Sequence, residues 1–129
     1  MKLSDDEFWL HQKRIKRGDH INIEIVSESM SPLINKGDIL RVRHKKLFSP
    51  FDIVVYRHID GTLICHYIWE RSRLDQKTWL LRSIKGTAFD LPVRENQILG
   101  HITHKKIGLK MKIAIFLKLF ALKVKRGLL

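Results

Sequence analysis

The spacing of hydrophobic residues changes twice along the chain. Over residues 4–17 it is helical, and Ser4 with Glu7 has the spacing of a capping box at the start. From residue 21 hydrophobic and polar residues alternate, which is the period of a strand. The isoleucines that share one side of this strand are Ile21, Ile23 and Ile25. The pattern therefore predicts an N-terminal helix over 4–17 and a strand over 21–26.

Five further segments have the length and composition of strands and are separated by turn residues. They span residues 38–43, 52–57, 62–69, 78–84 and 97–103. The sequence has no internal repeat and no Gly/Ser-rich linker, and its composition changes only near residue 104. Six short strands at this spacing are typical of antiparallel sheets that curl into a sandwich or partial barrel. We therefore expect a mainly β fold.

After residue 104 the helical spacing returns. At 100° per residue one face collects large apolar side chains: Leu109, Ile113, Phe116, Leu117, Phe120 and Val124. Lysines occupy most of the remainder, which is interrupted by Ile115, Leu119 and Leu122. The spacing predicts a C-terminal amphipathic helix. The chain then divides into an N-terminal helix (1–18), a β domain (19–104) and a basic amphipathic helix (105–129).

Composition narrows the class of protein. A chain of 129 residues with 44% hydrophobic and 29% charged residues is long enough for one folded domain with a core. The single cysteine, Cys65, cannot form an internal disulfide. No stretch reaches the roughly 20 apolar residues that span a bilayer, and the acidic start MKLSDDEFWLHQ is unlike a signal peptide. We therefore expect a cytoplasmic protein.

The net charge of +12 is concentrated in the tail, where eight Lys and Arg residues follow residue 104 without an acid among them. Such a segment binds phosphates on lipid or on nucleic acid, or packs on the sheet or on a second copy. Aromatic residues interleaved with basic ones would favour nucleic acid, but Phe116 and Phe120 both lie on the apolar face. The composition favours an anionic membrane surface, bound through residues 108–129 at the inner face of the membrane.

The stretch SESMSPLINKGD, residues 27–38, is either an ordinary polar turn or the site of a nucleophile. Pro32 suits the first turn of a short helix, which would place Ser29 and Met30 at a strand-to-helix corner. Backbone N–H groups are unpaired at such a corner and can stabilise an oxyanion. Ser27 could add its hydroxyl as a second donor.

Five segments in order give this stretch a context: SESMSPLINKGDILRV, PFDIVVYR, LICHYI, LLRSIKGTAFDLPV and QILGHI. Together they resemble the ordered motifs of type I signal peptidases and their smaller soluble relatives in the signal peptidase and self-cleaving repressor clan. The resemblance covers residues 21–103. It implies a curled antiparallel sheet and a serine endopeptidase that cleaves a peptide or a leader-like segment.

The resemblance also implies roles for individual residues. Ser29 would be the nucleophile, and Ser27 would join the Ser29 backbone N–H in the oxyanion hole. His66 stands where one branch has a lysine and another a histidine, and would be the general base, since an imidazole accepts a proton at neutral pH. Asp90 would orient His66. Lys85 is the alternative base, because Ser-Lys dyads are common in this clan.

Several positions depart from the motifs. Glu28 and Phe51 stand where glycine is usual, Tyr67 follows the histidine in place of arginine, and Thr87 replaces the first acid of the fourth motif. Glu28 and Thr87 favour an alternative function, a catalytically inactive domain of the same fold that binds a peptide or a membrane-associated partner. A nucleic-acid-binding β-barrel is a further alternative, favoured by the charge.

Other reactive side chains suggest no second chemistry. Cys65 precedes His66, but neighbours on a strand point to opposite faces, so we expect Cys65 in the core. Four other histidines have no metal-ligand spacing with cysteines or acids: His44, His58, His101 and His104. We therefore expect no metal and no cofactor.

Overall fold

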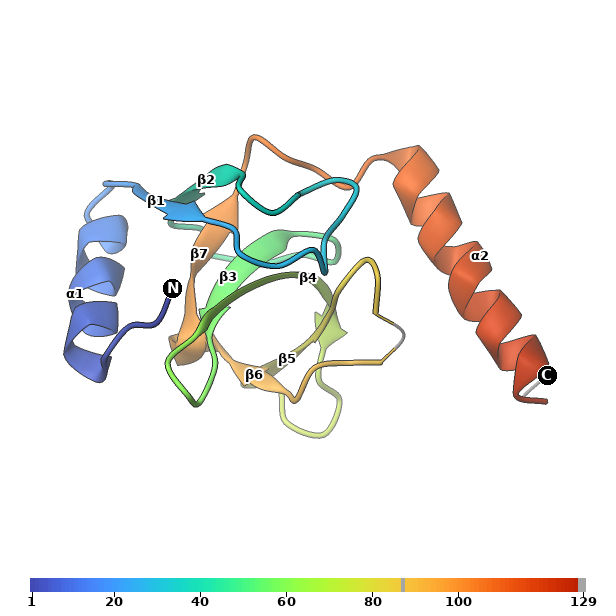
Figure 1. The fold of residues 1–129 in the computed structure, drawn as a ribbon. Coiled ribbons are helices and arrows are strands. Elements are labelled where there is room, and N and C mark those ends of the chain that lie inside the picture. The colour runs from blue at the N-terminus through green and yellow to red at the C-terminus, as the bar shows by residue number, and fades with distance from the viewer. Residues whose placement is uncertain (87, 128–129) are drawn as a thin grey trace.

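The computed structural model describes residues 1–86 and 88–127. Its strands are β1 (Ile21–Glu24), β2 (Ile39–Arg43), β3 (Ile53–Arg57), β4 (Leu63–Arg71), β5 (Thr78–Arg82), β6 (Val93–Arg94) and β7 (Ile98–Ile102). They form one antiparallel sheet in the order β1-β2-β7-β3-β4-β5-β6. The sheet curls into a half-barrel between the two terminal helices, as Figure 1 shows. The predicted mainly β fold with a helix at each end is confirmed.

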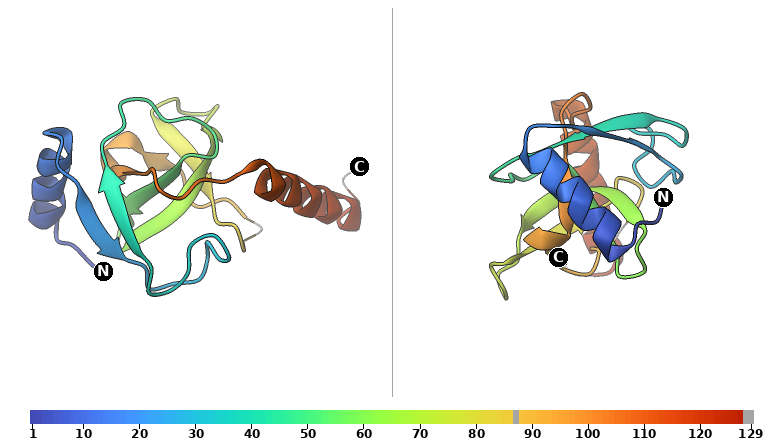
Figure 2. Two further views of the ribbon diagram at one scale, coloured as in Figure 1. Left: turned by 90° about the horizontal axis from the view of Figure 1, so that it is seen from above. Right: turned by 90° about the vertical axis from the view of Figure 1, so that its left-hand side faces the viewer.

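Helix α1 (Asp5–Lys16) begins and packs as its sequence predicts. The Ser4 side chain accepts from the Glu7 N–H and the Glu7 side chain accepts from the Ser4 N–H, so the capping box is formed. Phe8 and Ile15 are buried. The Gln12 side chain donates to the Asn96 carbonyl at 2.8 Å. These contacts hold α1 beside β7, on the opposite side of the sheet from the C-terminal helix (Figure 2).

Strand β3 is buried on both faces, and the middle of β4 has buried residues on each face, which explains their largely apolar sequences. Val55 and Cys65 belong to the core that also receives residues of the two helices. Val54 and Ile68 belong to a second core inside the curl of the sheet. His66 is paired with Val54 in the register and so lies on this second face, opposite to Cys65.

One strand was missed by the sequence pattern. Strand β6 has two residues and pairs with β5, with Val93 opposite Trp79. The short helix η1 (Glu95–Gln97) follows it. Two residues are too few to show a period, so only the pairing with β5 defines β6. The six strands expected from the sequence are all present, with bounds that differ by a few residues.

Helix α2 (Leu109–Lys125) is present as predicted and packs on the core through part of its surface. Ile115 is its buried residue, and Met111 and Leu119 pack partly against the core. The face that the sequence marks as apolar is at least half exposed: Leu109, Ile113, Phe116, Leu117, Phe120 and Val124. The contact is therefore made largely by Ile115 and Leu119, which interrupt the polar side, and by the edge of the apolar face at Phe116, whose ring meets Phe51 and Trp69. No helix in the described ranges has the length and apolar character needed to cross a bilayer.

Candidate active site

The serine-rich stretch forms a turn after β1. The short helix expected at Pro32 is absent from this stretch, where residues 29–34 make successive turns with a cis peptide between Ser31 and Pro32. The Ile34 N–H donates to the Met30 carbonyl at 2.9 Å, and both of these side chains are buried. The burial of Met30 and Ile34 anchors the turn and leaves Ser29, just before it, partly exposed.

Ser29 and His66 lie within hydrogen-bonding distance. The Ser29 Oγ atom is 3.1 Å from His66 Nε2, although the two residues are 37 positions apart. His66 lies in the middle of β4, where pairing with β3 fixes its backbone. This is the geometry that a serine and its general base require.

Asp90 completes a chain of three groups. One Asp90 oxygen, Oδ2, is 2.5 Å from His66 Nδ1, and the two side chains are 20% and 12% exposed. The Asp90 N–H donates to the Leu81 carbonyl at 3.0 Å, so β5 positions the carboxylate. An ionised Asp90 accepts the proton of Nδ1 and leaves the lone pair of Nε2 directed at Ser29.

Tyr56 is a fourth member that the sequence did not indicate. Its hydroxyl donates to Asp90 Oδ2 at 2.8 Å. Burial and the hydrogen bond to Asp90 raise the pKa of the Tyr56 hydroxyl, so it remains a donor. Alternation along β3 gives a signal that could have found it, since Tyr56 lies two residues from Val54, the partner of His66.

Two donors lie near the Ser29 Oγ atom. The Ser27 Oγ atom is 3.3 Å from it. Within residues 1–86 and 88–127 the Ser29 N–H has no protein acceptor. The Ser29 carbonyl, in contrast, accepts from the Lys85 N–H at 3.0 Å, which ties the turn to the segment between β5 and β6.

Lys85, the alternative base, is directed at Glu28. Its ammonium lies 3.6 Å from the Glu28 carboxylate, and both side chains are more than half exposed. Among the described residues no hydrogen bond joins its ammonium to Ser29. An exposed pair of this kind contributes little to stability.

The structure also places Phe51 and Tyr67, two other departures from the motifs, and the buried Cys65. Phe51 has φ 69, a conformation that glycine adopts without strain, which accounts for the glycine usual there. Its ring stacks on Tyr67 with centroids 5.7 Å apart. Thr87 lies outside the described residues. Cys65 is buried, as expected, and burial raises its thiol pKa to about 12.

A groove leads to Ser29 and His66. Its volume is about 250 Å³, and most of its lining is apolar. One wall is the backbone and side chains of residues 23–27, from the end of β1 to Ser27, and the other is residues 62–66 at the start of β4. Met1 also lines it. The groove therefore lies between two extended segments, and the side chains of Ser29 and His66 belong to its lining.

Comparison with known proteins identifies one family. The family model described as Peptidase S24-like matches residues 2–103 of the chain. The match agrees with the resemblance of the five ordered segments and ends before α2. No curated protein and no solved structure gave a significant match.

Proposed function

Because the chain belongs to the Peptidase S24-like family, we propose that it is a serine endopeptidase acting on a peptide or a leader-like segment. The observation that carries the proposal is the continuous chain of hydrogen-bonding distances from Ser29 through His66 to Asp90, at 3.1 Å and 2.5 Å. A serine with a base and an orienting carboxylate is the arrangement that activates an alcohol for attack on an amide.

In this mechanism the Ser29 Oγ atom attacks the scissile carbonyl while His66 Nε2 takes its proton. Asp90 stabilises the imidazolium that forms and keeps its ring in place. The Ser29 N–H and the Ser27 hydroxyl donate to the oxyanion. His66 then gives its proton to the leaving amine. In the second stage His66 takes a proton from the water that attacks the acyl-enzyme and returns it to the Ser29 Oγ atom.

The groove supports an extended peptide as substrate. An apolar groove of about 250 Å³ holds only a few short side chains at once. A peptide bound there by strand addition to β4 would gain main-chain hydrogen bonds independent of its sequence. We propose that small residues before the cut provide the specificity, as in the enzymes that the five segments resemble.

The test is cleavage of a peptide library by the purified wild-type protein, with Ser29→Ala and His66→Ala as variants. We expect both variants to lose activity by about 10³-fold or more. Full turnover in either variant would refute the assigned role. Peptide binding without cleavage by the wild type would instead favour the catalytically inactive domain.

We also propose that α2 binds an anionic membrane surface. The supporting observation is that its apolar face, which includes Phe116, Leu117 and Phe120, stays at least half exposed. A groove of about 940 Å³ between α2 and the side chains of Trp69 and Phe89 continues this apolar surface. Lysines on α2 flank it, and this combination suits the boundary between headgroups and acyl chains.

Pelleting with liposomes tests this proposal. We expect the full chain to sediment with liposomes rich in phosphatidylserine and to remain in the supernatant with neutral ones. The double variant Leu117→Glu and Phe120→Glu should stay in the supernatant with both, because it changes only exposed side chains. Equal recovery of the wild type in the supernatant with both kinds of liposome would refute the membrane role.

A further inference from the structure

The first three residues of the chain, here the N-terminal strand, make an isolated β-bridge beside the start of β4. Lys2 is paired with Thr62 in antiparallel register. The Leu3 N–H donates to the Gly61 carbonyl and the Leu63 N–H donates to the Met1 carbonyl, both at 2.9 Å. This N-terminal strand occupies part of the β4 edge that faces away from β3.

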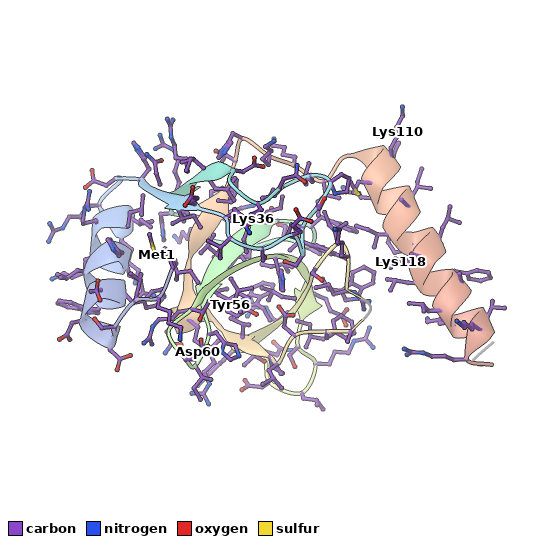
Figure 3. All side chains as sticks on the ribbon, viewed as in Figure 1. Met1, Lys36, Tyr56, Asp60, Lys110 and Lys118 are labelled. Carbon is purple, nitrogen blue, oxygen red and sulfur yellow. The ribbon has the colours of Figure 1, made fainter. Side chains whose placement is uncertain are left out.

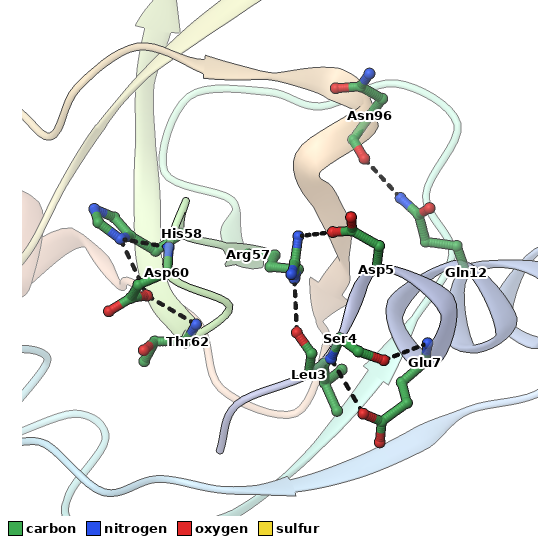
Figure 4. A network of polar contacts seen from close by, with 10 residues as sticks. All are labelled: Leu3, Ser4, Asp5, Glu7, Gln12, Arg57, His58, Asp60, Thr62 and Asn96. Carbon is green, nitrogen blue, oxygen red and sulfur yellow. Dashed lines mark hydrogen bonds and ion pairs between the residues drawn. The ribbon is translucent and has the colours of Figure 1, made fainter.

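Several contacts fix the N-terminal strand in place. The Leu3 side chain is buried. Arg57 donates through Nε to the Leu3 carbonyl at 2.9 Å and forms an ion pair with Asp5 at 2.7 Å (Figure 4). Gly61 has φ +90, and a Cβ atom there would lie 2.9 Å from the Leu3 carbonyl oxygen. The close approach of the strand therefore depends on glycine at this position.

The same edge of β4 continues to the active site. Strand β5 pairs with β4 only from Tyr67 onward, so residues 64–66 lie between the N-terminal strand and β5. The Thr62 carbonyl accepts from the His58 N–H, so the backbone groups of Thr62 point towards β3. The direction alternates along a strand, so the N–H and C=O of Cys65, three residues later, point into the gap. An added peptide strand would pair with β4 there.

The length of the gap limits that peptide. Met1 lies against Leu63, and His66 is three residues further along β4, which corresponds to about 10 Å at 3.3 Å per residue. Met1 lines the groove that contains Ser29 and His66. About three extended residues fit between the Met1 side chain and the Ser29 Oγ atom.

We infer that Met1–Leu3 form a fixed wall that closes one end of the peptide groove. On one side of the scissile bond the substrate then pairs with β4 over about three residues, and longer peptides gain nothing from further pairing. The inference rests on the proposed peptidase function, because it takes the groove to be the peptide site. It excludes the opposite role for Met1–Leu3, that of a plug which the substrate must displace.

A disulfide that locks the strand separates the two roles. Lys2 and Thr62 face each other between the two backbone hydrogen bonds described above. They are therefore a non-hydrogen-bonded antiparallel pair. Such a pair has Cα atoms about 4.5 Å apart, which a disulfide bridges. The Lys2→Cys and Thr62→Cys double variant is oxidised, and retention of Met1 is checked by mass spectrometry. The buried Cys65, with its thiol pKa raised to about 12, does not compete.

We expect the oxidised and reduced forms of this variant to cleave peptides with kcat/KM values within about twofold of each other. Loss of cleavage on oxidation, restored by a reducing agent, would overturn the inference, because the strand would then have to move. The reduced form is the matched control for any effect of the substitutions themselves.

Peptide length supplies the second measurement. Peptides that share one cleaved site are lengthened by one residue at a time, at either end. With the wild type we expect kcat/KM to rise several-fold for each of about three residues on one side and then to level off. A continued rise on both sides would contradict the wall. Binding of the same series to Ser29→Ala should level off at the same length. If the wild type cleaves none of them, the proposed function fails, while this binding series still tests the wall.

Discussion

The sheet and α2 use hydrophobic side chains in opposite ways. In the sheet Val54, Val55 and Ile68 are completely buried. In α2 the largest apolar side chains are exposed and Ile115 is buried in their place. The family match covers the sheet and ends before α2. The sheet therefore positions the candidate site, whereas α2 leaves most of its apolar side chains exposed.

The largest effect is expected at Asp90, which is held beside β5. Replacing it with asparagine keeps the shape but removes the charge that holds the Nδ1 proton of His66, which disfavours the reactive tautomer. We expect Asp90→Asn to lower kcat by about 10³- to 10⁴-fold. Steady-state kinetics on a cleaved peptide measure it. Asp19→Asn, at an exposed position, is the control and should be neutral. Equal activity of the two variants would remove Asp90 from the mechanism.

The next effect compares two neighbouring positions of α2. Ile115 is 5% exposed and Leu117 is 64% exposed. Truncation of a buried isoleucine to alanine lowers the free energy of unfolding by about 2–5 kcal/mol. Truncation of an exposed side chain changes it by about 0.5 kcal/mol or less. We therefore expect Ile115→Ala to lower the free energy of unfolding in urea and to deprotect the amides of α2 from hydrogen exchange. If Leu117→Ala has the larger effect, the helix packs through its other face.

The sequence predicted the parts of the structure that local spacing determines. The capping box at Ser4 places the start of α1, and the alternation from Ile21 onward places β1. The order of the five segments indicated that Ser29, His66 and Asp90 belong together, and the structure brings them within hydrogen-bonding distance. Their catalytic roles remain a prediction.

Features set by contacts between distant segments were missed. Strand β6 exists only through its pairing with β5. The turn after Ser29 is held by the burial of Met30 and Ile34 in the core, together with the hydrogen bond between their backbones. The side of α2 that packs depends on where the sheet lies, and the hydrophobic period of the helix contains no such information. Tyr56, on β3, meets Asp90, in the segment between β5 and β6, only once the sheet has folded.

A smaller effect tests whether α2 supports the active site. The Lys118 ammonium donates to the carbonyls of Ile84 and Lys85, at 3.2 Å and 2.8 Å. The Lys85 N–H in turn binds the Ser29 carbonyl. Lys118 lies on the side of α2 that faces the sheet, whereas Lys110 points away from it, as Figure 3 shows.

We expect Lys118→Met to lower kcat by roughly tenfold, equivalent to about 1.4 kcal/mol, with little change in KM. The Lys85 amide, which is hydrogen-bonded to the Ser29 carbonyl, should exchange faster at the same time. Lys118→Arg should restore much of the activity, and Lys110→Met is the control on the same helix. Unchanged kcat and unchanged exchange in Lys118→Met would show that α2 and the catalytic turn act independently.

The smallest effect is expected at Tyr56, which binds Asp90 but has no part in the proposed proton transfer. Its hydroxyl shares Asp90 Oδ2 with His66, so the two donors hold one carboxylate oxygen. Tyr56→Phe removes the hydroxyl but keeps the buried ring, and Asp90 retains its bond to His66. We therefore expect kcat to fall by only about three- to tenfold, the loss that accompanies removal of one hydrogen bond of about 1 kcal/mol. A loss as large as that of Asp90→Asn would mean that Tyr56 determines the position of the carboxylate, and that β3 as well as β5 holds the site.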